Sequence, residues 1–346
     1  MRKVVILLVF AFLLAIPASA LDYTAPTVPA DAEELMPADT DSFAQGLWKI
    51  VSSAISTLQP HLVSAAKICI SLIAIAILTT LLDHFPGNSK YIMRFVCCLA
   101  ISALLLTRTS SMVGLGSSTV TKLSDYGKLL LPVMTGALAA QGGTSAATAL
   151  YAGTMAFDTV LCTLIGKLLV PMIYMFLAIS IGNSATGEDL LKKVRDLLKW
   201  LMSWGLKVIL YIFTGYMSIT GVISGVVDAA TVKATKLTIS GMIPVVGGIL
   251  SDASEAVILG AGVMKSAVGI YGLLAIAAVW ISPFLQIAVQ YILLKITAAL
   301  CGVFGGKQIA ELIGDFTSAM GMLLAMTGAV CILLFVSVIC FMKGMG

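Results

Sequence analysis

Charged side chains are scarce in this sequence. Only 11% of the 346 residues are Asp, Glu, Lys or Arg, whereas 59% are hydrophobic, and the mean hydropathy is +1.05. An average soluble domain has about 25% charged residues. So few polar side chains cannot cover the surface of a soluble protein of this size, which excludes a soluble globular enzyme. A chain so rich in hydrophobic residues is not a disordered one either.

Motifs for catalysis, nucleotides or metals are also missing. The chain has two histidines, and no HExxH, Walker loop or strand-associated GxGxxG occurs. The seven cysteines form no CxxC and fall in apolar or nearly apolar runs, so we expect packing residues rather than a disulfide framework or a zinc site. They are Cys69, Cys97, Cys98, Cys162, Cys301, Cys331 and Cys340. We therefore expect no enzyme and no cofactor.

What the sequence does contain is a series of long apolar runs without the alternation of barrel strands. The predicted fold class is an all-α polytopic membrane protein with about six to eight transmembrane helices after a cleaved signal peptide. The signal is residues 1–20: Arg2 and Lys3, a short apolar run, and Ala18-Ser19-Ala20 as cleavage site. An uncleaved first anchor is the alternative.

The remaining chain divides by composition. Residues 21–45 carry six acidic and no basic side chains with three prolines, which predicts an acidic extracytoplasmic linker. Residues 46–346 are the multi-span helical membrane domain. Their basic excess suits cytoplasmic loops near anionic lipid and is too diffuse for nucleic acid.

Within that domain we expect spans near residues 62–82, 92–106, 207–227, 270–294 and 320–341. Residues 107–128 are rich in Ser, Thr and Gly and are predicted to lie at a surface. Residues 129–181 are too long and apolar for one helix, so we expect Pro132, Gly142-Gly143 and Pro171 to divide them into two or three passes.

Residues 187–204 predict an amphipathic helix. One face is apolar, and the other carries Lys192, Lys193, Arg195 and Lys199, the strongest cationic cluster in the chain. We expect this helix in the cytoplasm, either as an in-plane connector or as a docking helix for a partner.

The motif Pro-Val-x-x-Gly-x-Leu occurs twice, at residues 132–138 and 244–250, and the same offset of 112 carries Pro171 onto Pro283. This predicts an internal repeat, about 129–227 and 241–342, of the kind that builds many transport proteins. Pro132 with Gly136, and Pro244 with Gly247 and Gly248, predict paired broken helices inside the bundle. Ordinary interfacial turns are the alternative.

Several ionisable residues lie within or beside apolar stretches. Asp158 needs a partner or water if it lies at mid-bilayer. Lys67 and Lys167 are expected to snorkel from helix ends. Asp252 lies in a polar segment and either lines a cavity or belongs to a solvated loop, and Lys265 is a further candidate for a buried charge.

Residues 211–272 carry a resemblance to a known family. The segment includes Thr214-Gly215-Tyr216-Met217-Ser218 and, as its most specific part, Pro244-Val245-Val246-Gly247-Gly248 followed by Ile249-Leu250-Ser251-Asp252-Ala253. It resembles the stage III sporulation protein AE family of endospore-forming bacteria. The signal, the acidic stretch and the series of spans extend the resemblance over nearly the whole chain.

The resemblance implies a role rather than a reaction. It implies a core membrane subunit of a channel or secretion-like complex that links the mother cell with the engulfed forespore and sustains late forespore gene expression. The implied partners are stage III sporulation proteins AA (an ATPase), AB, AC, AD, AF, AG and AH, and indirectly stage II sporulation protein Q. The implied location is the mother-cell membrane around the forespore. The alternative is a self-contained permease for a small solute.

Overall fold

The computed structural model of this chain describes residues 26–37, 42–82, 89–140, 144–186, 189–219, 267–304 and 306–344. All the regular elements in these residues are helices, and six of them are long and apolar enough to cross a membrane. This confirms the prediction of an all-α multi-pass membrane protein, and the six long helices of the described residues agree with the predicted six to eight passes. The signal peptide and the second Pro-Val-x-x-Gly-x-Leu motif lie outside the described residues.

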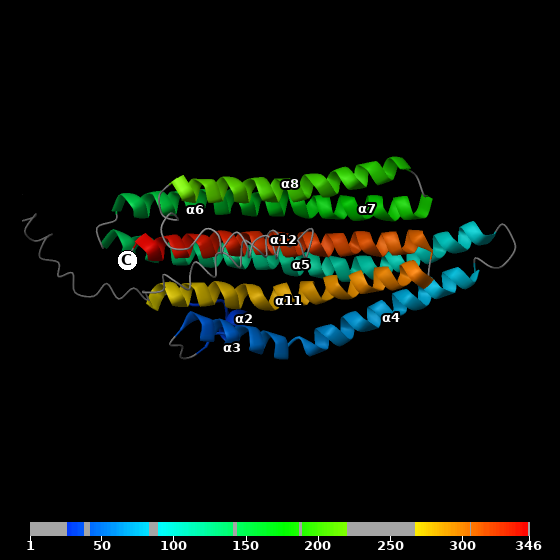
Figure 1. Ribbon diagram of the computed structural model, residues 1–346, viewed down its shortest axis with the longest axis horizontal. Coiled ribbons are helices and arrows are strands. Elements are labelled where there is room, and N and C mark those ends of the chain that lie inside the picture. The colour runs from blue at the N-terminus through cyan, green and yellow to red at the C-terminus, as the bar shows by residue number, and fades with distance from the viewer. Residues whose placement is uncertain are drawn as a thin grey trace, which may run out of the picture.

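The helices form an elongated bundle whose long members run along one axis (Figure 1). Two helices, α2 and α3, precede the spans, and the side chain of Ser42 caps α3 by accepting a hydrogen bond from the Gln45 amide. In chain order the elements are α2 (Ala30–Glu33), α3 (Phe43–Ser56), α4 (Gln59–Leu82), α5 (Ser89–Ala140), α6 (Thr144–Leu164), the π-helical turn η1 (Ile165–Leu169), α7 (Val170–Thr186), α8 (Asp189–Ile219), α11 (Ala267–Phe304) and α12 (Lys307–Gly344).

Helix α5 corrects two predictions. It runs unbroken for 52 residues and contains Pro132, so residues 107–128 form its middle rather than a separate surface segment. Pro132 removes one backbone donor, but it does not end the helix. Leu130, Leu131 and Met134 around it are buried, and this packing holds the helix together across the missing hydrogen bond. Pro132 and Gly136 are therefore not a helix break.

The segment from α6 to α7 is likewise one continuous helical rod. The π turn η1 lies inside it, where the Val170 amide donates to the Ile165 carbonyl. This widened turn immediately precedes Pro171, which has no amide hydrogen to continue the ordinary ladder. Pro171 therefore does not divide the passes, whereas the predicted division at Gly142-Gly143 agrees with the gap between α5 and α6.

Side-chain contacts fix the direction of each helix relative to its neighbours. Ser110 contacts Tyr174 and Ser124 contacts Asp158, so α5 and the α6–α7 rod are antiparallel. Arg195 contacts Asp315 and Lys199 contacts Ser318, so α8 and α12 are parallel.

The two halves of the predicted repeat share a construction in their described parts. The rod pairs with α8, and α11 pairs with α12, each as a helical hairpin with a short connection near residues 187–188 and 305–306. The long first helix of each hairpin contains a proline, Pro171 or Pro283. The part of the repeat that carries Pro244 stays a prediction.

Helix α12 forms the core of the bundle. In its apolar stretch 89% of the residues are buried, against 22–50% in the other five spans. It packs against α5, α6, α7, α8 and α11. The outer helices instead expose large apolar side chains such as Ile70, Val160 and Tyr211, as expected for surfaces that contact lipid.

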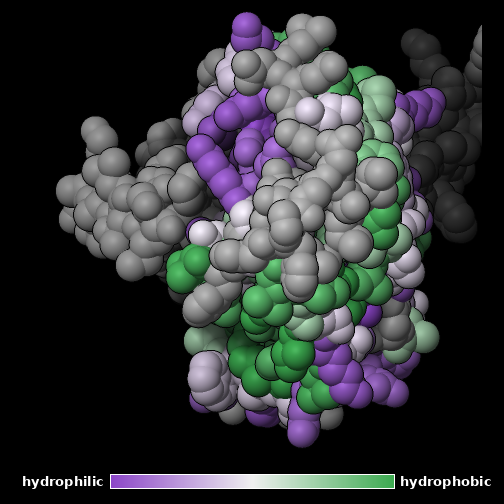
Figure 2. All heavy atoms as spheres, turned by 90° about the vertical axis from the view of Figure 1, so that its right-hand side faces the viewer, coloured by the Kyte–Doolittle hydropathy of each residue, from purple (hydrophilic) through white to green (hydrophobic). Residues whose placement is uncertain are grey.

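Figure 2 views the end of the bundle at which α8 and α12 begin. Hydrophilic residues form separate patches at the upper and lower edges of this face, and hydrophobic residues lie between them. This is the end that carries Lys192, Lys193 and Lys307.

Part of the predicted acidic linker packs against the bundle instead of being solvated. Val28 and Ala32 are buried, and Phe43, within the same predicted linker, is 2% exposed at the start of α3. Burying these apolar side chains outweighs the tendency of the acidic residues of the same stretch to stay in solvent.

Candidate functional site

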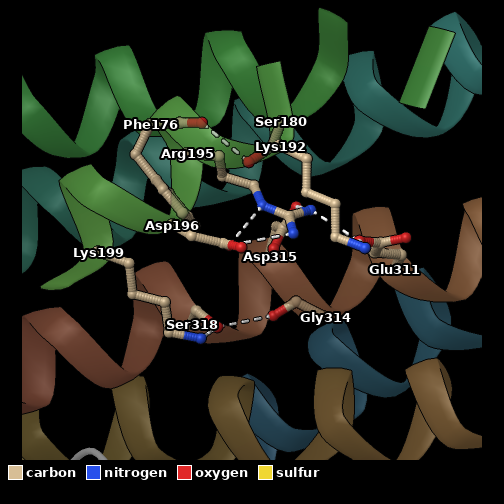
Figure 3. A network of polar contacts seen from close by, with 10 residues as sticks. All are labelled: Phe176, Ser180, Lys192, Arg195, Asp196, Lys199, Glu311, Gly314, Asp315 and Ser318. Carbon is tan, nitrogen blue, oxygen red and sulfur yellow. Dashed lines mark hydrogen bonds and ion pairs between the residues drawn. The ribbon is translucent and has the colours of Figure 1, made fainter. Parts of the chain in front are cut away.

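The largest group of charged contacts in the described residues centres on Arg195 of α8. Its side chain is only 7% exposed. One terminal nitrogen, Nη1, donates to Asp315 Oδ2 at 2.9 Å and to Glu311 Oε1 at 3.0 Å, both on α12 (Figure 3). The other two nitrogens, Nε and Nη2, donate to Asp196 Oδ1 at 3.2 and 3.1 Å. A guanidinium with fixed, planar donors suits this division between two helices.

Two lysines extend the contact between α8 and α12. Lys199 Nζ donates to Ser318 Oγ at 2.9 Å, and Lys192 Nζ lies 3.9 Å from Glu311 Oε1. The three cations thus face three acids, and their formal charges cancel. We call these residues the α8–α12 charge network: Lys192, Arg195, Asp196, Lys199, Glu311, Asp315 and Ser318.

The network shows which side of the predicted amphipathic helix meets the protein. The sequence pattern separates an apolar face from a cationic one but does not say which of the two packs against the bundle. In the structure Arg195 is buried against α12, whereas Leu197 and Trp200 are 59% and 58% exposed. In a membrane the apolar face can meet lipid, and the polar face must then find partners inside the protein.

The predicted separation of this helix from a following span is also wrong. Residues 189–219 form one helix, α8, that runs along the bundle beside α7 (Figure 1). The charge network therefore belongs to a helix long enough to cross a membrane, not to a separate in-plane connector.

Asp158 of α6 is buried, as its position in an apolar stretch requires, and it has polar partners. Ser124 Oγ of α5 donates to its Oδ2 at 2.5 Å, and Cys162 Sγ donates to its Oδ1 at 3.7 Å. One turn earlier in α6, Thr154 Oγ1 donates to Ser337 Oγ of α12 at 2.9 Å. These bonds tie α6 to α5 and α12 but do not connect with the charge network.

The structure brings few of the predicted site residues together. Asp158 is buried between helices, and Pro132 and Gly136 lie within continuous α5. Pro244, Gly247, Gly248, Asp252 and Lys265 lie outside the described residues. Among the described residues, no group of three or more His, Cys, Asp and Glu side chains could hold a metal ion.

The sequence predicts that the amphipathic helix after Gly187 aligns with a helix at residues 307–316, but Glu311 and Asp315 within that helix were not singled out. A signal was present, because they are four residues apart and so share one face of a helix, and one lies 116 and the other 120 positions after Arg195. That separation is close to the offset of the predicted repeat. Aligning the two halves by their helical hairpins brings the cationic and the acidic segment onto equivalent positions.

The geometry can join two helices through a set of charges that balance one another, with Arg195 and Asp315 buried at its centre. Because Arg195 and Asp315 pair across the two helices, the arrangement holds α8 in position against α12.

Comparison with known proteins finds one family, whose match covers nearly all of the described residues. Residues 32–345 match the stage III sporulation protein AE family. The chain is similar to the stage III sporulation protein AE of Bacillus subtilis (strain 168), with 22% identity over 239 residues. That match covers 69% of this chain and 60% of the relative. No solved structure matches the chain.

Proposed function

We propose that this chain, which belongs to the stage III sporulation protein AE family, is a membrane core subunit of the trans-envelope complex that links the mother cell with the engulfed forespore. The complex acts as a channel or secretion-like apparatus and is required for late forespore gene expression and spore formation. The observation that carries the proposal is the family match, which includes all six helices long enough to cross a membrane.

The interior of the bundle supports a positioning role. The α8–α12 charge network joins two spans through ion pairs between its own side chains. We propose that the chain performs no catalytic step and that energy comes from a partner, the AA ATPase. The other proposed partners are proteins AB, AC, AD, AF, AG and AH, with stage II sporulation protein Q as an indirect one. The proposed location is the mother-cell membrane around the forespore.

Affinity purification of the tagged full chain from sporulating cells tests this function. We expect the other stage III proteins to copurify, and deletion of the gene to abolish late forespore gene expression and spore formation. A host that sporulates normally without the chain would contradict the proposal.

Reconstitution in liposomes separates this proposal from a self-contained permease. A subunit is inactive when it is reconstituted alone. A permease moves small solutes with no other protein present, and such transport would favour the alternative function.

A further inference from the structure

The middle of α5 exposes an unusual face for a helix in a membrane bundle. Between residues 107 and 128 the exposed positions recur every three or four residues along one face, and no large apolar side chain in this segment is exposed. On either side of it, α5 exposes Val96, Leu104 and Leu129. We call the following seven residues the α5 polar face: Thr107, Ser111, Gly114, Ser118, Thr121, Asp125 and Lys128.

Contacts with the α6–α7 rod show where this face lies along the bundle. The Ser110 and Tyr174 hydroxyls are 3.4 Å apart, and Ser124 is bonded to Asp158. Between these two levels the rod exposes Val160 and Leu168 among polar residues that include Lys167, and just beyond Tyr174 it exposes Met175; each of the three apolar side chains is about half accessible. At one depth, therefore, the rod still exposes large apolar side chains, whereas the exposed face of α5 carries hydroxyls, a glycine and charges and no large apolar side chain. The polar face is about 30 Å long, close to the thickness of a bilayer's hydrocarbon core.

Contact with lipid is energetically unfavourable for the α5 polar face. The hydroxyls of Thr107, Ser118 and Thr121 bond to carbonyls of their own helix, which lowers the cost of exposure to lipid. Asp125 and Lys128 are different, because they are 60% and 49% exposed and pair with each other through a 2.9 Å contact. Exposed charges at membrane depth face water or protein rather than hydrocarbon.

A buried acid borders the same face. Asp158 receives its shortest hydrogen bond from Ser124, the residue next to Asp125. Among the described residues Asp158 has no ion-pair partner within 4 Å. Water on the adjacent α5 face would add to the polar surroundings that Ser124 and Cys162 already provide.

We propose that copies of this chain surround a water-filled path for polar solutes and that the α5 polar face lines it. The inference rests on the proposed function and adds which surface lines the path. The α5 polar face lies on the outside of one bundle, so another protein surface must enclose the path from the other side. Rotational symmetry brings the same face of every copy to one axis. The spacing of four and three residues suits helices that run side by side, and Asp125 of one copy complements Lys128 of the next.

Cysteine accessibility in the full chain tests the proposal. Ser111→Cys, Ser118→Cys and Thr121→Cys are small changes on the polar face, and Val160→Cys and Leu168→Cys are controls on the rod. The probe is a water-soluble maleimide, applied to opened membranes from sporulating cells. The unaltered chain gives the background from its own cysteines, six of which are buried and one half-buried. Thiols react as thiolates, which form in water and not in hydrocarbon.

The expected result is reaction at the three α5 positions on the order of ten-fold faster than at the two controls, because only hydrated thiols ionise. A water-soluble bifunctional maleimide should also join the new cysteines of two copies of the Thr121→Cys variant across the path, which a gel detects as a dimer. Unreactive α5 cysteines would overturn the proposal, because they would lie in a dry contact or face lipid. Reactive cysteines that the bifunctional reagent does not join would overturn the part that assigns the other side of the path to copies of this chain.

The labelling results can be interpreted whether or not the proposed function is correct. The labelling reports the surroundings of α5, whereas copurification and forespore gene expression report membership of the complex. If the chain copurifies with the stage III proteins but its α5 cysteines do not react with the maleimide, the proposed function stands and the water-filled path is rejected.

Discussion

At the scale of the residue, Arg195 is held by carboxylates from two helices. Asp196 lies beside it on α8, and Glu311 and Asp315 reach it from α12. A buried ion pair adds little net stability over an apolar pair, but removal of one partner leaves an uncompensated charge. The network therefore specifies which face of α8 meets α12.

Loss of Asp315 is predicted to destabilise the bundle. Asp315→Leu should cost about 3–5 kcal/mol, because Arg195 stays buried with fewer partners. The double variant Arg195→Met with Asp315→Leu should recover part of that loss, with a coupling energy of about 0.5–3 kcal/mol. Thermal unfolding of the purified protein in detergent measures both. Lys193→Ala, at an exposed position of α8, is the control and should change little.

The other buried aspartate is predicted to behave differently. Asp158→Asn keeps an oxygen that accepts from Ser124 and removes a charge that no cation within 4 Å balances among the described residues. The melting temperature of the Asp158→Asn variant should therefore match or exceed that of the unaltered protein. A loss as large as that of Asp315→Leu would show that the Asp158 charge has a partner of its own.

At the scale of the element, close packing holds the α6–α7 rod against α8. The Tyr216 hydroxyl of α8 donates to the Ala149 carbonyl at 3.0 Å, and its ring lies against Gly153. Phe157 packs on the rings of Tyr216 and Phe213, with centroids 5.7 and 5.4 Å apart. A residue without a side chain at position 153 allows this approach.

Gly153→Ala is predicted to separate the rod from α8, because the new methyl group would overlap the Tyr216 ring, which its hydrogen bond holds in place. The cost is about 1–3 kcal/mol, typical of overpacking. Gly215→Ala is the matched control on α8, where an added methyl group meets no atom within 4 Å. Thermal unfolding of the two variants compares them, and equal melting temperatures would contradict the close contact.

At the scale of the whole molecule, the order of the helices shows whether two predictions about orientation in the membrane agree with each other. The acidic stretch was expected outside the cytoplasm and the cationic helix inside it. Three spans, α4, α5 and the α6–α7 rod, lie between them, and an odd number of passes puts them on opposite sides. The two expectations are thus compatible, and the positive charges near the start of α8 favour the cytoplasm for that end.

Labelling from one side tests this orientation. Lys193→Cys is predicted to react with an impermeant maleimide only after the membrane is opened, because it lies near the start of α8. Thr144→Cys, exposed at the start of α6 and so at the opposite end of the rod, should react in intact vegetative cells that produce the chain in their cell membrane. The reverse pattern would invert the topology of the entire bundle.

The candidate site was only partly predictable. Asp158 stood out because a lone acid in an apolar stretch needs burial with partners, and the structure provides Ser124. Arg195 did not, because hydrophobic periodicity identifies two faces of a helix without telling which one meets lipid. Glu311 and Asp315 acquire meaning only through α8, which is more than 100 residues away in sequence.

The class of protein and the helical nature of its spans followed from the residues alone, because a long apolar run with few charges has few other stable forms in water or lipid. The spans predicted near residues 62–82 and 270–294 lie within α4 and α11. Packing between helices settled three further points: α5 continues past Pro132, the rod passes Pro171 through a π turn, and Arg195 faces inward. Each of these depends on neighbouring helices. Their packing compensates for a missing hydrogen bond, which local sequence alone would interpret as a helix break. Their carboxylates pair with a buried charge, which local sequence alone would place in solvent.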